Sequence, residues 1–213
     1  KVEEELHRFF PAARIERLDA DSARSTRNYR RIIDSFSAGT TDILIGTQII
    51  TKGFDFGGVA LVGILNADNL LLYPDFRSSE RAFQLIVQVG GRAGRRDEQG
   101  TVIIQTPQPD HPVIRQALNG DYETMIRTLL AERQTFLYPP FCRLISIIFR
   151  HRDRNLLQRA ADTFATQARR HFGRMLMGPE SPPVDRIRNQ FRLQFLLKID
   201  RRQAAVKQEL STL

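Results

Sequence analysis

Two arginines stand among glycines in the stretch QVGGRAGR, residues 88–95. A planar guanidinium binds an oxyanion through two parallel N–H groups, and glycines let the backbone pass close to a ligand. Arg92 and Arg95 therefore suit a phosphate-like anion, with the Gln88 amide available to orient phosphate or water. Two alternatives stay open, because the arginines can also form a basic surface turn and Gln88 can cap the end of a helix or strand.

A second polar loop follows the short apolar run DILIGT, residues 42–47. If this run is a strand of a parallel sheet, the loop lies at the carboxyl end of the strand, where ligands bind in α/β folds. The alternatives are that Asp55 satisfies a turn and that Lys52 is a solvated surface charge. The loop residues of interest are Thr47, Gln48, Lys52, Gly53 and Asp55.

Strand and helix patterns alternate through the first 120 residues and would position both loops. The apolar runs 42–47, 60–68 and 100–106 predict buried strands. Apolar side chains at helical spacing predict helices over 25–39 and 77–89. This alternation predicts an α/β domain, a parallel sheet with helices on both faces.

The pattern changes at about residue 120. A predicted helix over 121–136 ends at YPPF, residues 138–141, because consecutive prolines cannot continue it. A strand over 143–150, a helix over 154–172 and an alternating strand over 191–200 follow. These elements predict a small α+β domain with one solvated sheet face.

Basic side chains gather near the last predicted strand. Arg192 and Lys198 occupy the phase opposite to its apolar residues, and Arg186 and Arg188 precede it. Because side chains alternate across a strand, we expect a basic face suited to DNA phosphates or to an acidic peptide. The alternative is that these cations only keep the sheet soluble.

Composition favours an anionic partner, since the formal net charge is +8 and the pI is near 10.3. Cys142 is the one cysteine, so the sequence cannot form an internal disulfide or a cysteine-based zinc site. No apolar run approaches the roughly 20 residues of a membrane span, and a cytoplasmic protein is the expectation. Helical patterns at both ends predict a fragment of a longer protein.

The motifs, taken in order, resemble those of superfamily-two helicases. GTQIITKGFDF, residues 46–56, is similar to their motif V, and QVGGRAGR is similar to motif VI. The stretch 66–95 and YPPFCRL, residues 138–144, resemble more narrowly the PriA family of primosomal replication-restart helicases. The resemblance covers almost the whole chain; Gly90 stands where it predicts alanine.

This resemblance implies a second RecA-like helicase lobe over residues 1–120, truncated at its start. Residues 121–213 would form the C-terminal domain of the family, possibly truncated at its end. In such helicases ATP and Mg²⁺ bind between two lobes, and the first lobe supplies the phosphate-binding loop, which this sequence lacks. Zinc would belong to a cysteine-rich module upstream.

The resemblance also assigns roles to the residues of both motifs. Arg95 would be the arginine finger, with Arg92 beside it on the γ-phosphate and Gln88 orienting phosphate or water. Gly53 and Asp55 would lie near the nucleotide ribose. The residues facing the DNA backbone would be Thr47, Gln48 and Lys52.

The implied activity is that of an ATP-dependent 3′-to-5′ DNA helicase that remodels stalled forks and initiates replication restart through primosome assembly. The implied partners are forked and single-stranded DNA, single-stranded-DNA-binding protein and other primosome proteins, without a membrane. The fragment alone would not hydrolyse ATP. One alternative is a RecG-like or repair translocase lobe, although such lobes lack the YPPF segment and the small domain. The other is a non-enzymatic adaptor that binds DNA or protein.

Overall fold

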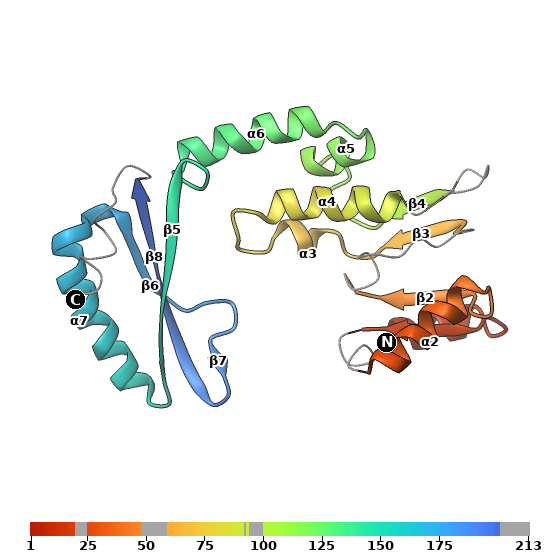
Figure 1. Ribbon diagram of the computed structural model, residues 1–213, viewed down its shortest axis with the longest axis horizontal. Coiled ribbons are helices and arrows are strands. Elements are labelled where there is room, and N and C mark those ends of the chain that lie inside the picture. The colour runs from red at the N-terminus through yellow and green to blue at the C-terminus, as the bar shows by residue number, and fades with distance from the viewer. Residues whose placement is uncertain (20–24, 48–58, 92, 94–99, 201–213) are drawn as a thin grey trace. The chain divides into compact units, whose positions relative to one another are not determined.

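The computed structural model describes residues 1–19, 25–47, 59–91, 93 and 100–200. The chain divides into two compact units (Figure 1). The first consists of Lys1–Tyr73 and Arg77–Met125, and the second of Pro74–Phe76 and Ile126–Leu213. Within the described ranges, no helix combines the length and the apolar character that crossing a bilayer requires.

Parallel strand pairs form the framework of the first unit. β1 (Ile15–Leu18) pairs with β2 (Ile43–Gly46), and β3 (Leu61–Ile64) pairs with β4 (Thr101–Ile104). Parallel pairing and the helices between strands confirm the predicted α/β class. Among the described residues, however, the strands stand as two separate pairs instead of one continuous sheet.

Helix α2 (Thr26–Ser37) connects β1 to β2 and covers their pair. The Ser25 hydroxyl accepts a hydrogen bond from the Asn28 N–H and so caps the first turn. Ile32 and Ile33 are buried against Leu18, which is fully buried. The helix ends before Gly39, whose φ of 71° is the left-handed conformation that glycine adopts without strain.

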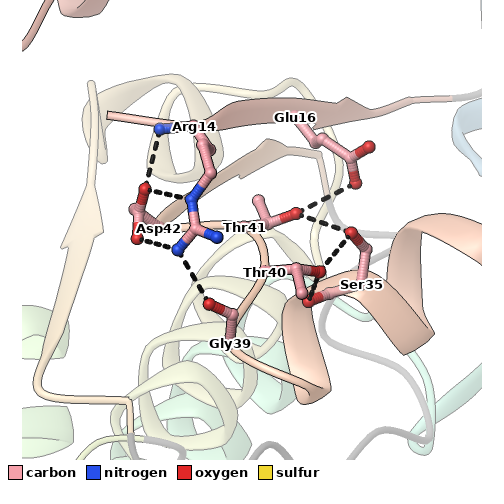
Figure 2. A network of polar contacts seen from close by, with 7 residues as sticks. All are labelled: Arg14, Glu16, Ser35, Gly39, Thr40, Thr41 and Asp42. Atoms are coloured by element: carbon pink, nitrogen blue, oxygen red, sulfur yellow. Dashed lines mark hydrogen bonds and ion pairs between the residues drawn. The ribbon is translucent and has the colours of Figure 1, made fainter. Parts of the chain in front are cut away.

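The amino ends of β1 and β2 are joined by the polar network in Figure 2. Arg14 donates to the Asp42 carboxylate from its backbone N–H at 2.8 Å, from Nε at 2.9 Å and from Nη2 at 2.7 Å. Nη2 also donates to the Gly39 carbonyl at 2.8 Å, which ties in the end of α2. Ligands of parallel sheets bind at the opposite, carboxyl ends, so this network is structural. Its other members are Glu16, Ser35, Thr40 and Thr41.

In the described part of the first unit, four further helices lie wholly within it. They are α1 (Val2–Phe9), α3 (Asp68–Leu71), α4 (Ser78–Gly90) and α5 (Pro112–Leu118). α4 connects β3 to β4 and buries Ala82, Phe83 and Ile86, so one face of the helix is fixed in the core.

An antiparallel sheet and one long helix build most of the second unit. The sheet order is β5–β8–β6, with β7 also pairing with β8. α6 begins within the first unit and continues into the second. The elements are α6 (Tyr122–Thr135), β5 (Cys142–His151), α7 (Arg154–Phe172), the 3-10 turn η2 (Gly173–Met175), β6 (Leu176–Glu180), β7 (Arg186–Ile187) and β8 (Gln190–Asp200).

One face of this sheet packs against α7. Leu193, Phe195, Leu197 and Ile199 of β8 are buried there, which confirms the predicted period-two phase of the strand. The Phe195 ring lies edge-on to Phe149 and Phe164, with centroids 5.6 and 5.1 Å away. Small side chains on α7 let the helix approach the sheet closely, and they are Ala161, Ala165 and Ala168.

Candidate nucleotide and nucleic-acid sites

Helix α4 carries the predicted anion-binding stretch at its C-terminal end. Gln88 lies in the last turn with an exposed side chain. Gly91 caps the helix, and its N–H donates to the Val87 carbonyl at 2.9 Å. Arg92 and Arg95 lie outside the described residues, so their roles stay predictions.

The second predicted loop begins directly after β2. Thr47 follows Gly46, the last residue of that strand, and is exposed at its carboxyl end. The carboxyl end of a strand is where ligands bind in parallel α/β sheets, so Thr47 lies where a ligand contact is expected. The remaining loop residues lie outside the described residues, and they are Gln48, Lys52, Gly53 and Asp55.

Three predicted basic residues of the second unit lie at one hairpin. β7 and β8 pair through Arg186↔Phe191 and Ile187↔Gln190. The Arg186 guanidinium lies 4.9 Å from the centroid of the Phe191 ring and donates to the Asn189 side-chain oxygen. Arg188 is exposed in the turn. Arg192 is half-buried on β8 and donates from Nη1 to the Val184 carbonyl at 3.2 Å.

Lys198 has a different environment. Its Nζ donates to the Phe136 carbonyl at 2.7 Å and lies 4.0 Å from the centroid of the Tyr138 ring. Six residues of extended strand separate it from Arg192, which is about 20 Å at roughly 3.4 Å per residue. Its ammonium is thus engaged within the second unit, so the predicted single basic face is divided. A DNA contact by Lys198 stays a prediction.

The Tyr138 ring also packs on Phe76, a residue from the segment between α3 and α4. The two rings stack with centroids 5.0 Å apart and planes 8° from parallel. On Phe76 the Arg133 guanidinium lies 5.1 Å from the ring centroid. The YPPF segment therefore does more than end α6, because its tyrosine forms a stack that holds Pro74–Phe76 in the second unit.

Sequence reasoning missed three arginines at the junction of β5 and α7. Arg150 pairs in register with Arg192, and His151 pairs with Phe191. Arg154 lies with its guanidinium 5.8 Å from the Phe191 ring centroid. The run RHRDR, residues 150–154, has the composition of a solvated turn, so only the antiparallel pairing of β5 with β8 relates it to the hairpin.

Two family models match the chain, one before α6 and one from the last two residues of α6 onward. The Helicase conserved C-terminal domain matches residues 1–97, and the Primosomal protein N C-terminal domain matches residues 134–213. The replication restart protein PriA of Bacillus subtilis is 40% identical over 93% of this chain. The chain belongs to the PriA family. The match to the Primosomal protein N C-terminal domain argues against the alternative of a RecG-like or repair translocase lobe.

PriA relatives from other bacteria align over a similar share of the chain. The protein of Treponema pallidum is 41% identical over 92% of it, and that of Haemophilus influenzae is 38% identical over 93%. The chain covers 25% of the B. subtilis protein, 30% of the T. pallidum protein and 27% of the H. influenzae protein. PriA membership confirms the predicted fold, a second RecA-like lobe followed by a small α+β domain.

Proposed function

We propose that this chain is part of an ATP-dependent 3′-to-5′ DNA helicase that remodels stalled replication forks and initiates replication restart. The observation that carries the proposal is the alignment of PriA proteins across 93% of the chain, through both units. In this proposal residues 1–120 are the second helicase lobe and residues 121–213 the C-terminal domain. The protein acts in the cytoplasm.

The lobe contributes cations to ATP hydrolysis. Arg95 offsets the charge that develops on the γ-phosphoryl oxygens, and Arg92 lies beside it. Gln88, on the exposed last turn of α4, orients phosphate or water. Gly53 and Asp55 lie near the ribose. ATP and Mg²⁺ are held mainly by a first lobe that this sequence does not include, and zinc belongs to a separate cysteine-rich module.

The chain also contributes DNA contacts. Thr47 is exposed at the end of β2, where its hydroxyl suits a phosphate oxygen, and we assign the same role to Gln48 and Lys52. In the second unit the exposed Arg186 and Arg188 meet DNA or the acidic tail of single-stranded-DNA-binding protein. The other proposed partners are further proteins of the primosome.

Replacing Arg95 in the full-length protein tests the enzymatic part. Arg95→Ala should lower the DNA-stimulated ATPase rate by about 10³-fold or more while DNA affinity changes little. Arg95→Lys should not restore turnover, because an ammonium lacks the planar fork of donors. The matched control is Arg27→Ala, which removes an exposed arginine from α2. Turnover of Arg95→Ala near that of the control would refute the assignment.

The isolated chain separates this proposal from the adaptor alternative. Without a phosphate-binding loop it should release no phosphate from ATP, with or without DNA. Addition of a polypeptide carrying the first lobe should restore some turnover, and that restoration should depend on Arg95. An adaptor would bind DNA or protein equally well but would gain no turnover from the added lobe.

A further inference from the structure

Six arginines gather at one end of the sheet in the second unit, and we call this the basic end. Figure 1 shows that the β5–α7 turn and the β7–β8 turn lie at the same end of the sheet. The strand register agrees, because it places the last residues of β5 beside the first residues of β8. The six are Arg150, Arg152, Arg154, Arg186, Arg188 and Arg192.

The carboxylates of the basic end do not neutralise it. Asp153 caps α7, since its Oδ1 accepts from the N–H groups of Asn155 and Leu156 at 2.8 and 3.1 Å. Those backbone donors lower the pKa of Asp153, and the carboxylate is thus engaged with the helix start. Asp185 is the second acid. Two carboxylates against six guanidiniums leave a strongly positive surface, which attracts anions.

Two of the arginines face each other across neighbouring strands. Arg150 and Arg192 are directly opposite in the β5–β8 register. Like charges at such positions destabilise an antiparallel pair. A bound anion that meets both guanidiniums removes that repulsion, so the arrangement favours a ligand carrying closely spaced negative charges.

The β7–β8 hairpin holds further arginines on a narrow ribbon. Its turn consists of Arg188 and Asn189, with φ angles of 49° and 63°. Both signs match the tight two-residue turns that suit the twist of a hairpin. Arginine is an unusual residue at a positive φ, where glycine is free of strain. Ile187 lies between Arg186 and Arg188 and is 45% exposed.

Single-strand binders stack bases on exposed aromatic rings. Here the Phe191 ring has the guanidiniums of Arg186 and Arg154 against it and packs on the core beneath α7. Phe191 is therefore not available to stack on a base. By contrast, the major groove of B-form DNA is wide enough to admit a two-stranded β-ribbon, and guanidiniums bind its phosphates and guanine edges.

We propose that the basic end binds double-stranded DNA, with the β7–β8 hairpin in the major groove and with its Arg188, like the arginines of the β5–α7 turn, on the phosphates. The inference deepens the proposed DNA role of the second unit and rests on it. It assigns the duplex, instead of the single strand, to this surface. It also adds Arg150, Arg152 and Arg154 to the predicted DNA-binding residues.

The test compares duplex with single-stranded DNA of equal length, using the 213-residue chain without ATP. Affinity is measured across a salt series for the parent and for Arg152→Ala combined with Arg188→Gly. Each lost phosphate contact should reduce the slope of log affinity against log salt by roughly 0.9 for a duplex, hence about 1.8 for the double variant. Single-strand affinity should change far less.

Controls separate lost contacts from lost charge and lost fold. Arg170→Ala with Arg174→Ala removes the same charge at the far end of α7 and should keep the duplex slope of the parent. Arg188→Gly should leave the thermal midpoint unchanged or raise it, because glycine relieves the positive φ. Arg188→Lys should keep most of the phosphate contact through its ammonium.

Two outcomes would overturn the proposal. If the salt slope of duplex binding is the same for the parent and for the Arg152→Ala, Arg188→Gly variant, the basic end does not contact DNA. An equal or larger loss with the single strand would assign it to single-stranded DNA. No step of this DNA-binding test involves ATP. Either failure therefore leaves the proposed role of Arg95 in ATP hydrolysis unaffected. Conversely, a loss of turnover in Arg95→Ala says nothing about DNA binding by the basic end.

Discussion

The register of β6 on β8 depends on Gly178, and Gly178→Ala tests that dependence. The residue has a φ of 102°, and a Cβ built there would lie 2.6 Å from the Gln194 carbonyl oxygen and 3.2 Å from the Phe195 Cα. Both are backbone atoms of the central strand, so no side chain can rotate away. An alanine must therefore push β6 off β8, at the point where their pairing shifts register between Met177 and Glu180.

Two terms set the magnitude. A residue with a Cβ at this positive φ has a strain cost of about 1–3 kcal/mol. Overpacking against the neighbouring backbone adds about 1–3 kcal/mol. We therefore expect Gly178→Ala to lower the free energy of unfolding of the second unit by about 2–6 kcal/mol, the sum of these two ranges.

Gly173→Ala is the matched control. Gly173 also has a positive φ, 49°, but a Cβ there meets no heavy atom within 4 Å. It should cost only the conformational strain, about 1–3 kcal/mol. The assay is native-state hydrogen exchange of β8 amides together with urea unfolding, because exchange reports the second unit separately from the first. If both variants lose the same stability, the close approach of β6 to β8 is not what requires a glycine.

Three further predictions concern single residues. Gly90→Ala should stabilise α4 by up to about 1 kcal/mol, because the new methyl would lie 3.8 Å from Val102 Cγ2, an ordinary contact, and alanine favours helices; slower amide exchange in α4 checks this. Hydrogen bonds from Arg14 lower the pKa of Asp42 in the folded state, so its stabilisation is present above the unfolded carboxyl pKa and is lost as pH falls through the folded one. Asp42→Asn should accordingly flatten the acid limb of a stability–pH curve, whereas an unchanged limb would contradict the pairing. Lys198→Met should lower thermal stability through loss of its carbonyl bond; a smaller salt slope of DNA binding would confirm the predicted DNA contact of its ammonium, and an unchanged slope would contradict it.

Local patterns in the sequence were sufficient to predict most of the elements. Burial of alternate residues in β8 and of residues at helical spacing in α2 and α4 depends on the covalent geometry of strand and helix, which repeats along the chain. The order of motifs V and VI, followed by YPPF, likewise indicated the family, because motif residues are neighbours in sequence. For the same reason Gln88 and Thr47 were correctly expected at the ends of a helix and a strand.

Contacts between residues far apart in sequence required the tertiary structure. Arg150 lies opposite Arg192 only because β5 and β8 pair antiparallel, and the register of that pairing is set by the core beneath α7. Lys198 has the alternation of a solvated cation, yet its ammonium bonds to the carbonyl of Phe136 near the end of α6. Phe76 precedes the helix that carries motif VI but packs on Tyr138 in the second unit. The sequence by itself thus determined the elements and the family, whereas side-chain surroundings were decided by packing between elements, which no local pattern encodes.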